Sequence, residues 1–174
     1  MSFDGARIVW SEGLFLRPQH FQHQERYLEW VLGTRVGQLQ PYGWGFSQLS
    51  LDTALLRSGK FGLKSALGLL PDGTPFELPS TEAPLAPLDV PVNARDSVIH
   101  LYAMLQRPDA KAVALDADTA RARRTRYQAI DAILTDNVVG SEGEAEAQLG
   151  QRVLGLCFEA DLDGAMRWAA ASRA

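Results

Sequence analysis

Residues 61–78 read FGLKSALGLLPDGTPFEL and carry a clear hairpin signal. The turn sequence Pro71-Asp72-Gly73-Thr74 separates two apolar runs. Proline fixes its own φ, and Gly73 accepts the positive φ that a tight turn requires. We therefore predict one strand over Phe61–Leu70 and a return strand through Phe76 and Leu78.

Further strands are expected on both sides of this hairpin. A short strand is bounded by Phe46 and Leu51. The run Val98–Leu105 is apolar on both alternating faces, as in a strand covered on both sides. In Leu149–Phe158, apolar residues alternate with mixed ones, so we predict a single strand with one side in the core.

Three segments are less regular. Tyr127–Val138 fits either a helix or a strand, and Gly140–Glu146 is polar and indicates a loop. The proline-rich stretch Pro79–Pro91 cannot be a helix or a central strand, because proline lacks the backbone donor. We expect it to be an extended connector along a sheet edge.

The N-terminal part has a different pattern. Arg7–Trp10 resembles a short strand, and Pro18 is suited to the first position of a helix. Residues 19–32 lack glycine and proline and carry two apolar or aromatic stripes at helical spacing, so this helix should have two neighbours. One neighbour would be the chain's own core and the other a partner. The predicted fold is mainly β, a β-sandwich with one N-terminal α-helix.

Composition and charge exclude several classes of protein. The chain has 174 residues, a formal net charge of −4 and 46% hydrophobic residues, which is typical of a globular domain. We expect no nucleic-acid binding and no membrane insertion, because the sequence is acidic and contains no apolar run long enough to span a bilayer. The basic cluster of Arg121, Arg123, Arg124 and Arg126 is expected to be a solvated loop or strand end. The single cysteine, Cys157, favours a reducing compartment, most simply the cytoplasm.

Motifs of catalysis and of cofactor or metal binding are weak. No nucleophile elbow, phosphate-binding loop or dinucleotide fingerprint is present. His20 and His23 have a spacing at which two histidines can share a metal, but a polar or interface role is favoured. Asp161–Gly164 begins like a calcium loop without its terminal glutamate, so a turn is expected. We read Cys157 and His100 as packed residues. The prediction is a protein without enzymatic activity, cofactor or metal.

Large apolar groups concentrate near the N-terminus. The set that we select as candidate partner-binding residues is Trp10, Leu14, Phe15, Leu16, Arg17 and Phe21. Two interpretations remain open. The segment either anchors its aromatic residues under a sheet or exposes them as an assembly surface, because aromatic residues are enriched at interface hot spots.

The same segment carries a family resemblance. Residues 8–22, IVWSEGLFLRPQHFQ, resemble the opening of the TssK family (ImpJ, VasE), baseplate subunits of bacterial type VI secretion systems. Later pieces agree in order: PYGWGF at 41–46, GKF at 59–61, LPDGTPF at 70–76 and LDVP at 88–91. The similarity extends over about residues 7–164. It implies an N-terminal shoulder domain over residues 1–164 of a longer architecture with a neck and a head. The Ala-rich tail, residues 165–174, departs from the family pattern and is expected to fray or form a short helix.

The resemblance also implies a function. Family members assemble as homotrimers and dock through the shoulder onto the baseplate wedge proteins TssG and TssF, at the inner face of the cell envelope. Two other functions are kept as alternatives. A carbohydrate-binding β-sandwich of phage receptor-binding type would stack a sugar on Trp44 or Trp168, and a hydrolase would use an unrecognised site.

Overall fold

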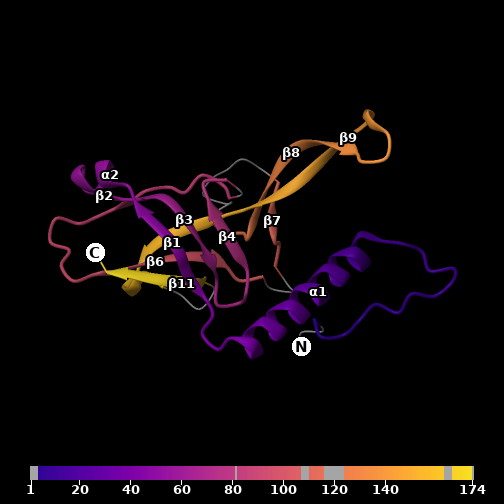
Figure 1. Ribbon diagram of the computed structural model, residues 1–174, viewed down its shortest axis with the longest axis horizontal. Helices are drawn as coiled ribbons and strands as arrows, with labels where there is room; N and C mark the ends of the chain where they lie inside the picture. Colours follow the sequence, from indigo (N-terminus) through magenta and orange to yellow (C-terminus); the bar gives the residue numbers. More distant parts are fainter. Residues whose placement is uncertain (1–3, 81, 107–109, 116–123, 163–165, 174) are drawn as a thin grey trace.

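The computed structural model describes residues 4–80, 82–106, 110–115, 124–162 and 166–173. The helix α1 (Pro18–Leu39) comes first and is followed by the strands β1 (Gly45–Leu51), β2 (Lys60–Phe61), β3 (Leu63–Leu69), β4 (Pro75–Leu78), β5 (Leu88–Asp89), β6 (Val98–Met104), β7 (Val113–Ala114), β8 (Tyr127–Asp136), β9 (Gly140–Arg152), β10 (Leu154–Phe158) and β11 (Met166–Arg173). A short helix α2 (Thr53–Arg57) and a 3-10 turn η1 (Glu159–Asp161) complete the order (Figure 1).

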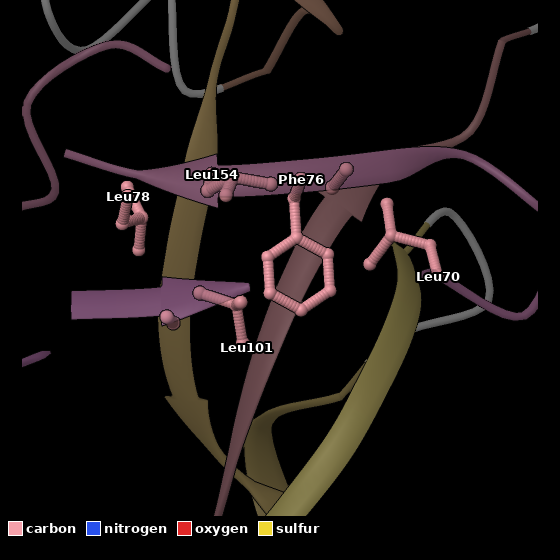
Figure 2. Close-up of a cluster of buried hydrophobic side chains, with 7 residues drawn as sticks. Leu70, Phe76, Leu78, Leu101 and Leu154 are labelled. Carbon is pink, nitrogen blue, oxygen red and sulfur yellow. The ribbon is translucent and has the colours of Figure 1, made fainter. Parts of the chain in front are cut away.

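Two three-stranded antiparallel sheets pack against each other to form the core. One has the order β1-β3-β4 and the other the order β10-β6-β11. Buried side chains from both sheets meet between them, and Figure 2 shows this cluster around Phe76. Its buried members are Ala66, Leu70, Phe76, Leu78, Leu101, Ala103 and Leu154. The predicted sandwich is therefore confirmed.

The hairpin prediction is also confirmed. β3 and β4 pair antiparallel, and the turn between them closes through a hydrogen bond from the Gly73 N–H to the Leu70 carbonyl at 2.8 Å. Gly73 has a φ of 82°, which a residue with a side chain rarely adopts. The expected single strand over 61–70 is divided into β2 and β3. The first of these pairs with β5, so the proline-rich connector does run along a sheet edge.

A third sheet, with the order β7-β8-β9, resolves the ambiguous regions. Tyr127–Asp136 is the strand β8, and the expected polar loop at 140–146 is wrong because these residues are the start of β9. Alternating glutamate and alanine there satisfy the two-residue period of a strand, and β8 supplies the hydrogen-bonding partner. The predicted single strand 149–158 is interrupted at Val153, where the chain leaves β9 and enters β10.

The two ends of the chain also differ from expectation. The segment 7–10 is not a strand in the structure. Residues 166–173 do not fray or form a helix but make β11, which pairs antiparallel with β6. Alanine has a high intrinsic helix propensity, but the edge of β6 offers hydrogen-bonding partners along its length, and tertiary context overrides propensity.

Helix α1 lies beside the β layers, and the chain before it projects as a loop past the start of the helix (Figure 1). None of its residues is buried. The expectation that one side of this helix packs into the chain's own core is therefore wrong. The helix predicted from Pro18 is itself present.

Candidate functional site

The loop before α1 exposes most of the candidate partner-binding residues. Phe15 is 85% exposed, and Trp10, Leu16 and Phe21 are each at least half exposed. Arg17 is also exposed, whereas Leu14 is half-buried. In this chain the interpretation as a core anchor is wrong, because the aromatic rings lie on the surface.

Local contacts hold this loop in a defined shape. The Leu14 N–H donates to the Ser11 carbonyl at 3.2 Å, and Gly13 completes the turn at a φ of 80°. The Trp10 ring lies edge-on to the His20 ring, with 6.4 Å between centroids. It also contacts Phe21, with 6.5 Å between centroids. The ring of Trp10 is therefore packed against the first turn of α1, at the base of the projecting loop.

The residues before the loop run along the helix. The ring of His23 is hydrogen-bonded through Nε2 to the Ala6 carbonyl at 2.8 Å. The guanidinium of Arg7 lies over the Tyr27 ring, 5.8 Å from its centroid, and Asp4 pairs with Arg26 at 3.6 Å. The segment predicted to be a strand is thus bound by side chains of a helix. No described strand pairs with it there, which explains why it lacks β-structure.

An apolar ridge continues from the loop along α1. Its members follow Phe21 at steps of seven, four and seven residues, which keeps them on one side of a helix. They are Phe21, Leu28, Leu32 and Leu39, and each is at least half exposed. Sequence analysis predicted two stripes on this helix and expected the chain's own core to cover one and a partner the other. The neighbouring sequence predicts no second helix that could pack on the apolar stripe of α1. This signal could have indicated that the stripe is exposed.

Contact between α1 and the β layers is narrow. A Cβ added to Gly33 would lie 3.1 Å from the Asp72 carbonyl oxygen, so the helix backbone lies directly on the β3–β4 turn. Beside this contact is a cleft lined by both the helix and the sheets, including Trp30, Val36, Pro75 and Arg126. The glycine therefore permits an approach that a larger residue would prevent.

A buried arginine stabilises the turn on which the helix rests. Arg126 is 6% exposed and donates from Nη2 to Asp72 Oδ2 at 3.0 Å and to Thr74 Oγ1 at 2.6 Å. Its Nη1 donates to the Met104 carbonyl at 3.0 Å. The guanidinium therefore connects the β3–β4 turn to the end of β6. The prediction that Arg126 belongs to a solvated basic cluster is wrong, since the acidic turn provides a buried partner. Arg124 is exposed, and Arg121 and Arg123 lie outside the described residues.

The charges around this turn shift three pKa values. Burial alone would raise the pKa of the Asp72 carboxyl, but Arg126 and hydrogen bonds involving Thr74 outweigh it, and the pKa falls below its usual range. Burial would lower the pKa of Arg126, but Asp72 holds it above its usual range. On the facing side of α1, partial burial raises the pKa of the Glu29 carboxyl, and Arg126 opposes that shift. Asp72 and Arg126 thus form a charged pair.

The other candidate groups do not form a site. The Arg17 N–H donates to His20 Nδ1 at 3.3 Å, so both helix histidines hold the N-terminal loop. His100 is buried, with its Nε2 3.8 Å from Glu159 Oε1, and Cys157 is buried, as expected for packed residues. Asp161 ends the turn η1, while Asp163 and Gly164 lie outside the described residues.

The described residues contain neither a cluster of metal-binding side chains nor a membrane-spanning helix. Among the residues that the structure describes, no group of three His, Cys, Asp or Glu side chains could hold a metal ion. The helices within the described ranges are all too short or too polar to cross a membrane. Trp44 is partly exposed, and the side chain of Trp168 lies outside the described set.

Comparison with known proteins gives consistent matches. A family model for bacterial type VI secretion proteins (EvfL, ImpJ, VasE) matches residues 20–170. The type VI secretion system baseplate component TssK1 of Pseudomonas aeruginosa is 41% identical over 155 residues, which cover 89% of this chain and 34% of that protein. The chain therefore spans about a third of the length of this relative.

Solved structures agree in fold. A crystal structure of TssK matches 95% of this chain and 37% of its own, with a TM-score of 0.84 and 35% identity. A cryo-electron microscopy structure of a TssK-TssF-TssG baseplate subcomplex matches 95% of this chain and 59% of its own, with a TM-score of 0.76. The identity in the second case is 19%, so that likeness concerns the fold alone.

Proposed function

Because the chain belongs to the bacterial type VI secretion family of EvfL, ImpJ and VasE, we propose that it is the shoulder of a baseplate subunit and docks that subunit onto TssG and TssF. Two findings support the proposal. A 41% identical relative is a TssK1 baseplate component, and a protein of the same fold occurs in a complex with TssF and TssG. The docking surface in this proposal is the loop and helix start that carry Trp10, Leu14, Phe15, Leu16, Arg17 and Phe21.

Exposure of the aromatic loop carries the proposal. Phe15 is 85% exposed although it is a large apolar residue, and Trp10 and Phe21, whose ring centroids are 6.5 Å apart, are each at least half exposed. Contiguous apolar groups on a surface are typical of interaction sites. Burying such a side chain against a partner contributes about 1.5–3 kcal/mol. Arg17 would add a planar set of donors for a carboxylate or carbonyl of the partner.

The proposal includes assembly and location. The subunit would form a homotrimer, so that three loops are presented to the wedge proteins together. Its place would be the cytoplasmic side of the cell envelope, where the baseplate assembles. No catalytic step is part of this function, because burial of surface against partners is sufficient for docking.

Two substitutions test the docking surface in the full chain. Phe15→Ala and Phe21→Ala should each weaken binding to the TssG and TssF proteins of the same system, with a hot-spot loss of about 2 kcal/mol or more. Val92→Ala is the matched control, because Val92 is fully exposed but lies in the connector before β6. Binding is measured by titration calorimetry, and folding by thermal unfolding.

The outcomes separate the interpretations. Loss of binding by the two Phe variants but not by Val92→Ala, at unchanged unfolding temperature, supports the loop as the docking surface. Full-strength binding by both Phe variants shows that the wedge proteins dock elsewhere. Unfolding of both variants would show that Phe15 and Phe21 stabilise the fold and are not a separate docking surface.

A further inference from the structure

The β8–β9 hairpin is a second surface without an assigned role. β9 is the longest of the described strands, with 13 residues, and it lies at the edge of the sheet β7-β8-β9. The hairpin extends away from the two core sheets as a two-stranded ribbon (Figure 1). An isolated ribbon of two strands is marginally stable in water unless other structure packs against it. The exposed surface of this hairpin is therefore a candidate for contact with a partner.

One face of this ribbon is apolar. Residues directly opposite each other in an antiparallel pair share a face, and the register places Ile130 opposite Leu149 and Leu134 opposite Ala145. Between them, Ala132 is opposite Ala147. Ile130, Leu134 and Leu149 are 37%, 47% and 41% exposed. The small alanines leave room above the sheet for larger side chains from another segment.

The opposite face is acidic. Glu144 and Glu146 alternate along β9 opposite Thr135 and Ile133, and Asp131 accepts a hydrogen bond from Gln148 at 3.1 Å on the same face. From 127 to 151 the sequence contains no lysine or arginine. Arg152, the last residue of β9, pairs with Glu82 at 2.8 Å and lies opposite Tyr127, so no basic side chain of the ribbon lies opposite Asp131, Glu144 or Glu146.

The outer edge of β9 is the third observation. β9 pairs with β8 on its inner side. Among the described residues, the backbone of its outer side is hydrogen-bonded only near its end, where the Ala83 N–H donates to the Arg152 carbonyl at 2.9 Å. Ala83 thus adds a single backbone hydrogen bond to this edge. Beyond it, the edge presents backbone donors and acceptors to which another strand can add.

From these three features we propose that the outer edge of β9 accepts an extended segment of a partner protein in which lysine or arginine alternates with apolar residues. The basic side chains would lie beside Glu144 and Glu146, and the apolar ones would cover Leu149 and the alanines. A second copy of β9 is a poor occupant, because antiparallel self-pairing places glutamate beside glutamate, which is destabilising. This edge is separate from the N-terminal loop, so the inference does not depend on docking through that loop.

A peptide titration tests the proposal with the full chain. The probe is a synthetic peptide that alternates lysine and valine, and the control peptide has the same composition in two blocks. The alternating peptide should bind more tightly and should slow amide hydrogen exchange over residues 144–150. Glu144→Lys with Glu146→Lys should weaken its binding about tenfold, because two favourable cross-strand pairs become repulsive.

A matched double variant controls for net charge. Glu12→Lys with Asp161→Lys changes the charge equally at two exposed positions outside the ribbon and should leave binding unchanged. Thermal unfolding verifies that each variant is folded. The proposal is overturned if the block peptide binds equally well, if exchange in β9 does not slow, or if the control variant loses as much affinity. Concentration-dependent protection of β9 without peptide would identify a second copy as the occupant and would also overturn it.

Discussion

Phe76 and Phe15 are the same residue type in opposite surroundings. Phe76 is 1% exposed between the two core sheets, and Phe15 is 85% exposed on the N-terminal loop. The two regions have similar apolar character in the sequence. An apolar pattern in the sequence therefore predicts that a surface becomes buried. The pattern does not predict whether the same chain or a partner buries that surface.

The reason lies in the number of layers. Each core sheet faces another sheet, so Phe76 contacts Phe46 in an edge-on geometry, with 5.5 Å between ring centroids, and packs against Leu101 and Leu154. Among the described residues, helix α1 meets the β layers at the narrow contact at Gly33 and along the cleft beside it. Its outer ridge therefore remains available for a partner.

The largest expected effect is on the core. Phe76→Ala should destabilise the chain by about 3–5 kcal/mol, because it removes a fully buried ring and leaves a cavity between the two sheets. Urea unfolding measures the loss, and Phe15→Ala is the exposed comparison. Equal losses for the two variants would contradict the contrast between the regions.

The charged pair under the helix should give the next largest effect. Asp72→Asn should cost about 1–3 kcal/mol at neutral pH, because Arg126 then lacks its ionised partner in a buried position. The pKa of Asp72 is lowered on folding, so its contribution is complete above the usual aspartate value of 3.8 and is lost as the pH falls further through the depressed pKa.

Unfolding in urea over a pH series checks this linkage. The difference in stability between the parent chain and Asp72→Asn should be constant above about pH 4 and should shrink at lower pH. A difference that stays constant down to pH 2 would show that the ionised carboxylate is not the source.

Two glycines of α1 test the contact between the helix and the β3–β4 turn. Gly37→Ala should stabilise the chain by up to about 1 kcal/mol, because alanine favours helix and nothing lies within 4 Å of the new Cβ. Gly33→Ala should stabilise the chain less than Gly37→Ala, since the new Cβ would lie 3.1 Å from the Asp72 carbonyl oxygen. Thermal unfolding compares the two. A larger gain at Gly33 would mean that the helix does not rest on the turn.

The smallest effect on stability is expected at the loop. Phe15→Ala should change the free energy of unfolding by no more than about 0.5 kcal/mol, because the ring is already in water in the folded chain. Urea unfolding of the chain without partners measures this. A loss above about 2 kcal/mol would place the ring in a core and remove the contrast with Phe76.

The sequence alone was sufficient where local chemistry and periodicity agree. The turn at 71–74, the flanking strands, the helix from Pro18 and the apolar run at 98–105 were all predicted, because turn residues and side-chain periods are properties of neighbouring residues. The aromatic loop was also recognised as unusual, and its motif pointed to the family. These features need no knowledge of contacts distant in the chain.

Tertiary structure decided the rest, because the remaining questions concern what lies opposite each segment. Arg7–Trp10 lacks a described strand beside it and is held by side chains of α1, whereas the Ala-rich end gains a neighbouring strand in β6 and becomes β11. Arg126 is buried because Asp72 and Thr74 meet it from a turn more than 50 positions away. Exposure of Phe15 and burial of Phe76 follow in the same way from which layer, if any, covers each ring.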